Sequence, residues 1–490
     1  MTQATQKGQE MVATNQRKWL ALALLSAVQF MVVLDIAIVN VALPSIKVDL
    51  GFSQENLQWV ISAYALVFGG FLLLGGRAAD LLGRRRIFLA GIVVFTLASL
   101  LAGLAWSEGS LIAARSFQGL GAAIISPAAL SMLSVTFVEG RERNIALGVW
   151  GAVGGFGAAA GVLLGGILTD ALSWEWIFFV NVPVGAVAFG LAPLLLKESR
   201  DARVRSFDVP GAVLVTGGLS SLVYAITKAG QDGWVAGQTL AFFAVAVVLL
   251  AAFVVWEQRH AEPLMRFGLL RTKTVAGANV AGFILGTALF SMFLMLTLYM
   301  QQVLGYSAMK SGVAYLAVAG TAILWSAVAA QVVTRVGVKP VLVVGMTALT
   351  GGLVYFTQVS VGGTYAGDLL PGFLLVGFGI GFSFVPISIA ALAGVQPAEA
   401  GLASGLFNTS QQIGGALGIA ALSTIATSTT SDKLAAGVGQ SAALVDGFTA
   451  AFLAGVGIAA AGIVAALALI RRDELEQAPA EAEPALDLAA

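Results

Sequence analysis

The chain has 490 residues, of which 58% are hydrophobic and only 11% charged, and its formal net charge is zero. Soluble domains carry about 25% charged residues, so this composition excludes a water-soluble enzyme. At roughly 20 residues per crossing, the length admits a dozen or more membrane-spanning helices. The long apolar runs also differ from the alternating segments of about ten residues that build a transmembrane β-barrel. The sequence therefore predicts an all-α polytopic membrane protein.

Fourteen apolar segments follow one another along the chain, and each is predicted to span the membrane. In chain order they cover residues 18–44, 57–76, 86–106, 110–136, 144–170, 175–196, 208–228, 236–256, 274–301, 309–333, 339–358, 367–393, 400–427 and 447–470. An even number of spans places both termini on the same side of the membrane.

The loops on the side of the N-terminus hold nearly all of the basic residues. Of the 26 Lys and Arg residues, the opposite loops hold only Lys47, Lys228, Lys310 and Lys433, and Arg115 lies within a span. Short basic loops stay on the cytoplasmic side of a membrane. We therefore expect a multi-pass protein of the cytoplasmic membrane with both termini in the cytoplasm.

The chain also divides into two related halves. The loop Gly83-Arg84-Arg85-Arg86 recurs weakly as Gly337-Val338-Lys339-Pro340, each after the second span of a set of six. Two six-helix bundles related by a parallel repeat, with two helices inserted between them, are an architecture of secondary transporters. The predicted organisation is a cytoplasmic N-terminal segment 1–17, a six-helix bundle 18–196, an inserted two-helix hairpin with basic cytoplasmic linkers 197–273, a second six-helix bundle 274–470 and a disordered cytoplasmic tail 471–490. We expect the inserted pair at the periphery, in contact with lipid and outside the transport pathway.

Two charged residues lie inside predicted spans, Asp35 in the first and Arg115 in the fourth. At 1.5 Å per residue, Asp35 is about 26 Å from the inner face and Arg115 about 8 Å from the outer one, so both lie in the outer third of the bilayer. A charge at this depth is costly and usually serves function, which predicts that Asp35 carries protons and that Arg115 meets it or shares its cavity. The alternatives are a structural ion pair, an aspartate exposed in an outer vestibule, and an arginine that snorkels to the surface.

Glycines and amides mark two further spans. In the fifth, Gly157, Gly161 and Gly165 recur every four residues, a spacing typical of close helix packing that also suits conformational switching. In the thirteenth, Asn408, Gln411 and Gln412 lie near mid-depth, where amides either line a cavity or bond across helices. Phe378, in the phenylalanine-rich twelfth span, either faces lipid or core or contacts a substrate.

Some kinds of chemistry are excluded. The chain has no cysteine and one histidine, His260, so thiolate, haem and multi-histidine metal sites are not expected. It has no Gly-Lys pair and hence no phosphate-binding loop for ATP. We expect no catalytic residues, metal, cofactor or nucleic-acid partner, and energy from an ion gradient, from the substrate's own gradient or from another protein.

Five sequence motifs, taken together, are similar to those of one transporter family. Residues 34–44 read LDIAIVNVALP, residues 76–86 GRAADLLGRRR, residues 115–121 RSFQGLG and residues 174–183 WEWIFFVNVP, and Asn408-Thr409 follows in the thirteenth span. In this order and over essentially the whole chain, they resemble the 14-span drug:proton antiporter branch of the major facilitator superfamily.

The resemblance implies roles for particular residues. Asp35 would be the protonation site and Arg115 its coupling partner. Asp80, Gly83 and Arg84 would form a cytoplasmic latch between the bundles. Gly157, Gly161 and Gly165 would belong to the antiporter motif, in which Val162 stands where the family has proline.

The expected function is proton-coupled antiport that exports amphipathic or cationic drugs or antibiotics by alternating access. The expected partners are protons, the lipid bilayer and a small amphipathic substrate, and the protein is expected to act as a monomer. Candidates for the substrate cavity are Asn40, Tyr64, Gln118, Asn181, Phe378, Asn408, Gln411 and Gln412. The alternatives are an exporter of an endogenous metabolite (an antibiotic, siderophore or amino acid) and a non-transporting sensor on the same fold.

Overall fold

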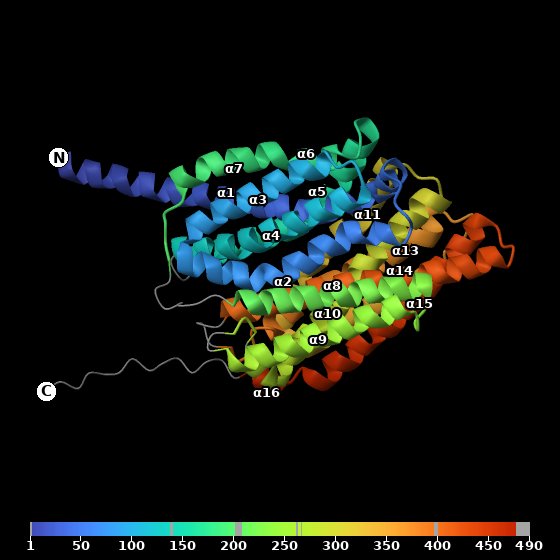
Figure 1. Cartoon of the computed structure of the whole chain (residues 1–490). Helices are drawn as coiled ribbons and strands as arrows, with labels where there is room; N and C mark the ends of the chain where they lie inside the picture. The colour runs from blue at the N-terminus through green and yellow to red at the C-terminus, as the bar shows by residue number, and fades with distance from the viewer. Residues whose placement is uncertain are drawn as a thin grey trace.

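The computed structural model describes residues 2–137, 141–200, 208–260, 263–265, 267–395 and 400–476. The described residues are mainly helical, and the helices run roughly parallel to one long axis (Figure 1). Thirteen of these helical segments are long and apolar enough to cross a membrane, and a further apolar stretch covers Ala159–Ala171. The prediction of an all-α protein with many membrane spans is therefore confirmed.

The first bundle contains seven helices, because the sixth span is divided at Val180. They are α1 (Thr2–Leu50), α2 (Trp59–Leu82), α3 (Arg84–Gly103), α4 (Glu108–Thr136), α5 (Arg141–Ala171), α6 (Trp176–Phe179) and α7 (Asn181–Leu195). The helix α1 extends beyond both limits of the first predicted span and includes Pro44. Membrane helices tolerate such an internal proline because neighbouring groups satisfy the freed backbone.

The inserted pair consists of α8 (Val209–Asp232) and α9 (Gly237–Arg259). The second bundle contains α10 (Lys273–Leu298), α11 (Ala308–Val336), α12 (Val338–Phe356), α13 (Leu370–Ala390), α14 (Ala400–Ala435) and α15 (Gln440–Leu469). In the segment predicted to be a disordered tail, α16 (Arg472–Glu476) is helical, and Glu474 accepts a 2.7 Å hydrogen bond from the backbone of Thr274. Residues 477–490 of that tail lie outside the described part of the chain.

The two bundles repeat the same helix pairing. In the first, α1 packs on α5, and α2 and α3 both pack on α4; in the second, α10 packs on α14, and α11 and α12 both pack on α13. These pairs occupy equivalent places in the two sets of six spans, as a parallel repeat requires.

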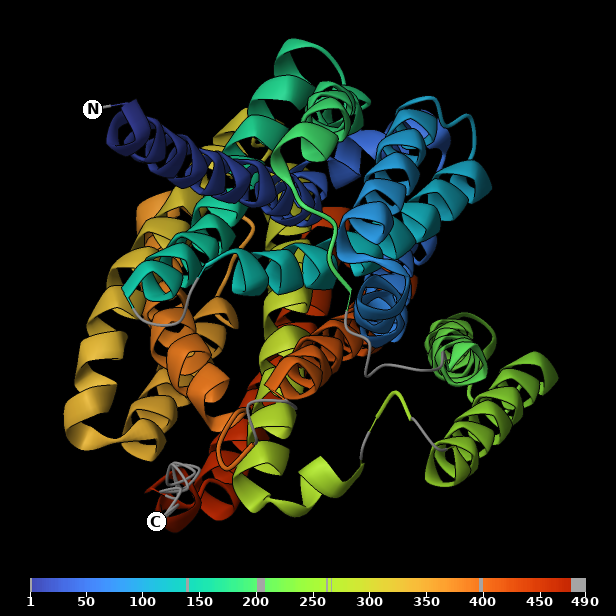
Figure 2. The same ribbon diagram turned by 90° about the vertical axis from the view of Figure 1, so that its left-hand side faces the viewer.

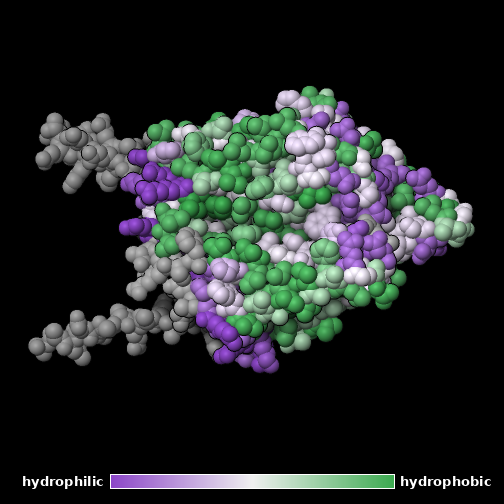
Figure 3. Space-filling view, in the orientation of Figure 1, coloured by the Kyte–Doolittle hydropathy of each residue, from purple (hydrophilic) through white to green (hydrophobic). Residues whose placement is uncertain are grey.

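The start of α1 and the short helix α16 lie at the same end of the molecule (Figure 1). We call it the inner end, following the predicted orientation, and call the opposite end the outer one. On the face seen in Figure 3, hydrophobic residues cover the middle and hydrophilic residues gather toward the two ends, as expected for a molecule that crosses a bilayer.

The inserted helices lie side by side at the edge of the molecule (Figure 2). The helix α9 lies outermost. Within the most apolar 18-residue stretch of each helix, 17% of α9 is buried and 44% of α8. The buried side of α8 contacts both bundles: Gln58 at the start of α2 donates a 2.8 Å hydrogen bond to Thr227, and Thr424 of α14 donates one of 3.3 Å to the carbonyl of Ile226. The pair is thus peripheral, and α8 packs over the seam between α2 and α14, while its contact with lipid stays a prediction.

Glycines allow the helices of each bundle to approach closely. A Cβ added at Gly414 of α14 would lie 2.0 Å from the carbonyl oxygen of Phe283 in α10, and one added at Gly286 would lie 2.0 Å from that of Gln411. Small residues at such contacts bring backbones together, which is how membrane helices gain packing energy without a hydrophobic driving force.

We predict that Gly414→Ala lowers stability by about 1–3 kcal/mol, because the new methyl group forces α10 and α14 apart. The measurement is thermal unfolding of the purified protein in detergent. Gly457→Ala is the control, since a Cβ at Gly457 in α15 has nothing within 4 Å. Equal stability of the two variants would contradict this account of the packing.

Candidate functional site

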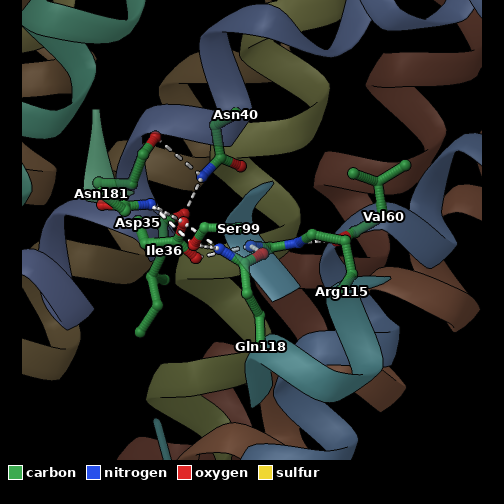
Figure 4. Close-up of polar contacts among 9 residues, drawn as sticks. Asp35, Ile36, Asn40, Val60, Ser99, Arg115, Gln118 and Asn181 are labelled. Atoms are coloured by element: carbon green, nitrogen blue, oxygen red, sulfur yellow. Dashed lines mark hydrogen bonds and ion pairs between the residues drawn. The ribbon is translucent and has the colours of Figure 1, made fainter. Parts of the chain in front are cut away.

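An ion pair lies buried inside the first bundle (Figure 4). Asp35 of α1 and Arg115 of α4 are 0% and 1% exposed, and Nη1 of Arg115 lies 2.6 Å from Oδ2 of Asp35. The two charges that the sequence places at similar depth therefore meet directly, without access to solvent in this conformation. Isolating either charge here would cost several kcal/mol, so each requires the other.

Amide side chains complete the coordination of the carboxylate. Oδ1 of Asp35 accepts hydrogen bonds of 2.8 Å from the amides of Gln118 and Asn181. Gln118 also donates to the hydroxyl of Ser99 at 2.7 Å and accepts from Arg115 at 2.8 Å, so it bridges both charges. Both oxygens of the Asp35 side chain are therefore engaged, Oδ2 by Arg115 and Oδ1 by the two amides.

The guanidinium group of Arg115 has two further contacts on α2. Its Nε donates a 2.9 Å hydrogen bond to the carbonyl of Val60 in α2, and its centre lies 4.4 Å above the ring of Tyr64. The site thus joins α1, α2, α3, α4 and the first residue of α7. Protonation of Asp35 would remove the Coulomb attraction and leave Arg115 as an uncompensated buried cation. Arg115 would then have to move or gain water.

Three residues predicted to line the substrate cavity lie around this ion pair. Tyr64, Gln118 and Asn181 are at most 2% exposed, and each contacts Asp35 or Arg115. Their contact with a substrate stays a prediction. The fourth, Asn40, is 4% exposed and donates to the carbonyl of Ile36 in its own helix at 3.1 Å. Its side-chain oxygen has no hydrogen-bond partner among the described residues.

Sequence reasoning missed two members of the site, Ser99 and the carbonyl of Val60. A single serine in an apolar span carries no signal, and a backbone carbonyl carries none at all. Only the positions of α3 and α2 beside Arg115 and Gln118 reveal them.

The predicted cavity residues of the second bundle lie apart from the ion pair. Phe378 of α13 stacks on Phe382 with ring centroids 4.4 Å apart and meets the edge of Trp325 of α11 at 4.9 Å. The rings of Phe378 and Trp325 are half-buried. They form an aromatic surface that remains partly accessible.

The amides of α14 point in different directions. Ile413 and Leu417 of α14 pack against the cluster formed with α8, so the exposed side chain of Asn408, nearly opposite on the helix, faces away from α8. Gln412 is 7% exposed and lies against Gly69 of α2, with its side-chain oxygen unpartnered among the described residues. Gln411 is half-buried on the side of α10.

The predicted cytoplasmic latch joins α2 and α3 to the segment after α7. Arg84 lies 2.8 Å from Asp80, which also accepts a hydrogen bond from Ser131. Gly83 has a φ of 113°, which favours glycine, and a Cβ there would lie 2.7 Å from the carboxylate of Glu198. These described partners of Asp80 all belong to the first bundle, so its role between the bundles stays a prediction.

The glycines of α5 pack against the helix that carries Asp35. Added Cβ atoms at Gly157, Gly161 and Gly165 would lie 3.1 Å from Val33, 2.7 Å from Ala37 and 2.6 Å from the carbonyl of Ile38. The packing role is thus visible in the structure, whereas the role in conformational switching stays a prediction.

We predict that Arg115→Gln destabilises the protein by about 3–5 kcal/mol, because it leaves the carboxylate of Asp35 buried and unpaired. The double variant Asp35→Asn/Arg115→Gln should be more stable than Arg115→Gln alone, because it buries no charge. Thermal unfolding of the purified variants measures both effects, and a double variant less stable than Arg115→Gln would contradict them.

The chain is similar to known proteins over most of its length. The model of the Major Facilitator Superfamily matches residues 25–419. The puromycin resistance protein pur8 of Streptomyces alboniger is 41% identical over 461 residues, covering 93% of this chain and 92% of its own. The cephamycin export protein CmcT of Amycolatopsis lactamdurans is 41% identical over 419 residues, covering 84% and 85%.

Solved structures show the same fold at low sequence identity. The nucleoside transporter NupG matches with a TM-score of 0.66 and 13% identity, covering 93% of this chain and all of that one. A bacterial homologue of the human lysosomal transporter Spinster, solved in an inward-facing and unoccupied conformation, matches with a TM-score of 0.64 and 16% identity, covering 95% and 99%.

Proposed function

This chain belongs to the Major Facilitator Superfamily, and from that premise we propose that it exports amphipathic drugs or antibiotics across the cytoplasmic membrane in exchange for protons. It is a membrane transporter and not an enzyme. The names of its relatives, which describe resistance to puromycin and export of cephamycin, support the substrate class.

The main support for proton coupling is the Asp35–Arg115 ion pair. Nη1 of Arg115 lies 2.6 Å from Oδ2 of Asp35, and both side chains are almost wholly buried. A carboxylate held in this way exchanges protons only when another conformation opens a path to it. Proton uptake then breaks the pair, since the neutral acid no longer balances Arg115. The proton and the conformation of the first bundle are therefore linked, as antiport by alternating access requires.

We place the substrate cavity between the bundles, with Phe378, Trp325 and Asn408 as the proposed contacts from the second bundle. Aromatic faces attract cations and apolar rings alike, and an amide both donates and accepts hydrogen bonds. This set suits an amphipathic molecule that carries a positive charge. The buried polar residues described in α10–α15 are uncharged, so Asp35 remains the acidic group assigned to the proton.

The remaining features follow from the same proposal. The excess of basic residues on one side supports cytoplasmic termini. The proton gradient supplies the energy, and no bound cofactor is required. Both bundles come from one chain, which supports a monomeric transporter. Export of a self-made antibiotic is the second candidate function, favoured by the likeness to the cephamycin export protein.

We predict that Asp35→Asn abolishes transport driven by a pH gradient, because asparagine keeps the shape and one acceptor oxygen but binds no proton. The variant should still fold, with lower stability because Arg115 loses its counter-charge. The experiment reconstitutes the protein in proteoliposomes and measures puromycin or cephamycin flux with an imposed gradient. Asp232→Asn is the control, since this carboxylate lies at the outer end of α8 and is 43% exposed. Full gradient-driven flux by the Asp35 variant would exclude the proposed coupling.

We predict that Asp80→Asn slows transport severalfold and leaves equilibrium substrate affinity unchanged, because Asp80 organises the inner ends of α2 and α3 away from the proposed cavity. Flux in proteoliposomes and equilibrium binding of the same substrate separate the two effects. A hundredfold loss of affinity would place Asp80 in the binding site instead.

A further inference from the structure

A carboxylate of the first bundle caps a helix of the second bundle at the outer end. Asp170 lies in the last turn of α5, and α11 begins at Ala308. Oδ1 of Asp170 accepts a 3.2 Å hydrogen bond from the backbone N–H of Ala308, and Oδ2 accepts one of 2.8 Å from that of Met309.

This contact completes the N-terminus of α11. The first N–H groups of a helix have no partner within the helix and need an external acceptor. In α11 the next one, that of Lys310, donates to the side chain of Ser307 at 3.2 Å. The first three N–H groups are thus all satisfied, two of them by the opposite bundle. The negative charge of Asp170 also suits the positive end of the helix dipole.

The helices around this cap touch backbone to backbone. A Cβ at Gly166 of α5 would lie 2.6 Å from Cα of Met309, and one at Gly312 of α11 would lie 2.4 Å from the carbonyl oxygen of Val162. Nearby, Gln301 donates a 2.8 Å hydrogen bond to the carbonyl of Val41 in α1. These contacts hold the outer ends of the two bundles together.

Water reaches the outer side of the cap. Asp170 is exposed, and together with Asp49, Trp174 and Gln302 it lines a cavity of about 820 Å³ between the outer ends of the bundles. If the bundles separate, both the carboxylate and the two N–H groups gain water as a replacement partner. The contact can therefore open and close at a modest cost, unlike the buried pair at Asp35.

We propose that Asp170 is an outer latch, which closes the outer end by capping α11 and releases it when the transporter opens outward. The proposal rests on alternating access in the proposed function. At the inner end, the described partners of Asp80 lie within its own bundle. The outer carboxylate is therefore engaged across the seam in this structure, and Asp80 shows no such engagement among the residues described.

The absence of cysteine in the chain makes a direct test possible. Val48 and Val361 are exposed residues at the outer ends of the two bundles. Spin labels on cysteines introduced at these two positions report the distance between the bundles by pulsed electron paramagnetic resonance. In this background Asp170→Ala should raise the ratio of long to short distances about tenfold, equal to about 1.4 kcal/mol. Asp170→Asn keeps one acceptor oxygen without the charge and should give a smaller increase.

The matched control is Asp446→Ala. Asp446 is an exposed acid at the outer end that pairs with Lys433 of its own bundle at 2.9 Å. An unchanged distance ratio in both Asp170 variants, or an equal change in Asp446→Ala, would overturn the latch. Circular dichroism and thermal unfolding identify a variant that fails to fold. If Asp170→Ala does not fold, the distance ratio of Asp170→Asn decides whether Asp170 is a latch.

The distance measurement needs no substrate and no proton gradient. A shift in the ratio by the Asp170 variants, with no drug flux in proteoliposomes, would support the latch and count against the proposed export. Drug flux with no shift in either variant would do the reverse.

Discussion

Two opposite charges removed from water set the arrangement of the first bundle. Asp35 and Arg115 each lose hydration worth several kcal/mol, and only direct contact with further hydrogen bonds offsets the loss. Those bonds come from α2, α3, α4 and α7, so the hydrogen-bond network of the ion pair links four helices to α1.

The second bundle repeats the helix pairing without buried charge among its described residues. There, uncharged contacts such as the 2.9 Å hydrogen bond from Ser410 to Asn279 join α14 and α10. One half of a symmetric architecture therefore holds a buried ion pair, while the other offers aromatic and amide surface.

The position of α5 connects this ion pair to the outer end of the molecule. Its glycines lie against α1 around Asp35, while Val162, Gly166 and Asp170 lie against α11. With so little side-chain volume in between, α5 lies close to the backbones of both α1 and α11. The carbonyl of Val162, at the position where the resemblance implies a proline, lies close to Gly312 of α11. The helix α5 thus supplies both the glycines that pack against α1 and the carboxylate that caps α11.

The inserted hairpin shows what hydropathy settles and what it leaves open. The helix α9 has a mean hydropathy of 2.7 against 1.7 for α8, and α9 is also the less buried of the two. Lipid and protein interior are both apolar, so this difference does not say which helices α8 packs against. Hydrogen bonds from Gln58 to Thr227 and from Thr424 to the carbonyl of Ile226 show that, since they tie α8 to both bundles.

The sequence by itself determined the properties that the bilayer imposes on each segment separately. Span number, helical class and the two charges that need a partner all follow from transfer energies of single segments, which are local in the chain. Only the tertiary structure decided which groups meet. It placed Gln118, Asn181 and Tyr64 around the ion pair, added Ser99 and the carbonyl of Val60, and joined Asp170 to α11. These contacts depend on the rotation and neighbours of each helix. In an apolar solvent those are set by close packing at glycines and by hydrogen bonds between distant residues, and hydropathy carries no record of either.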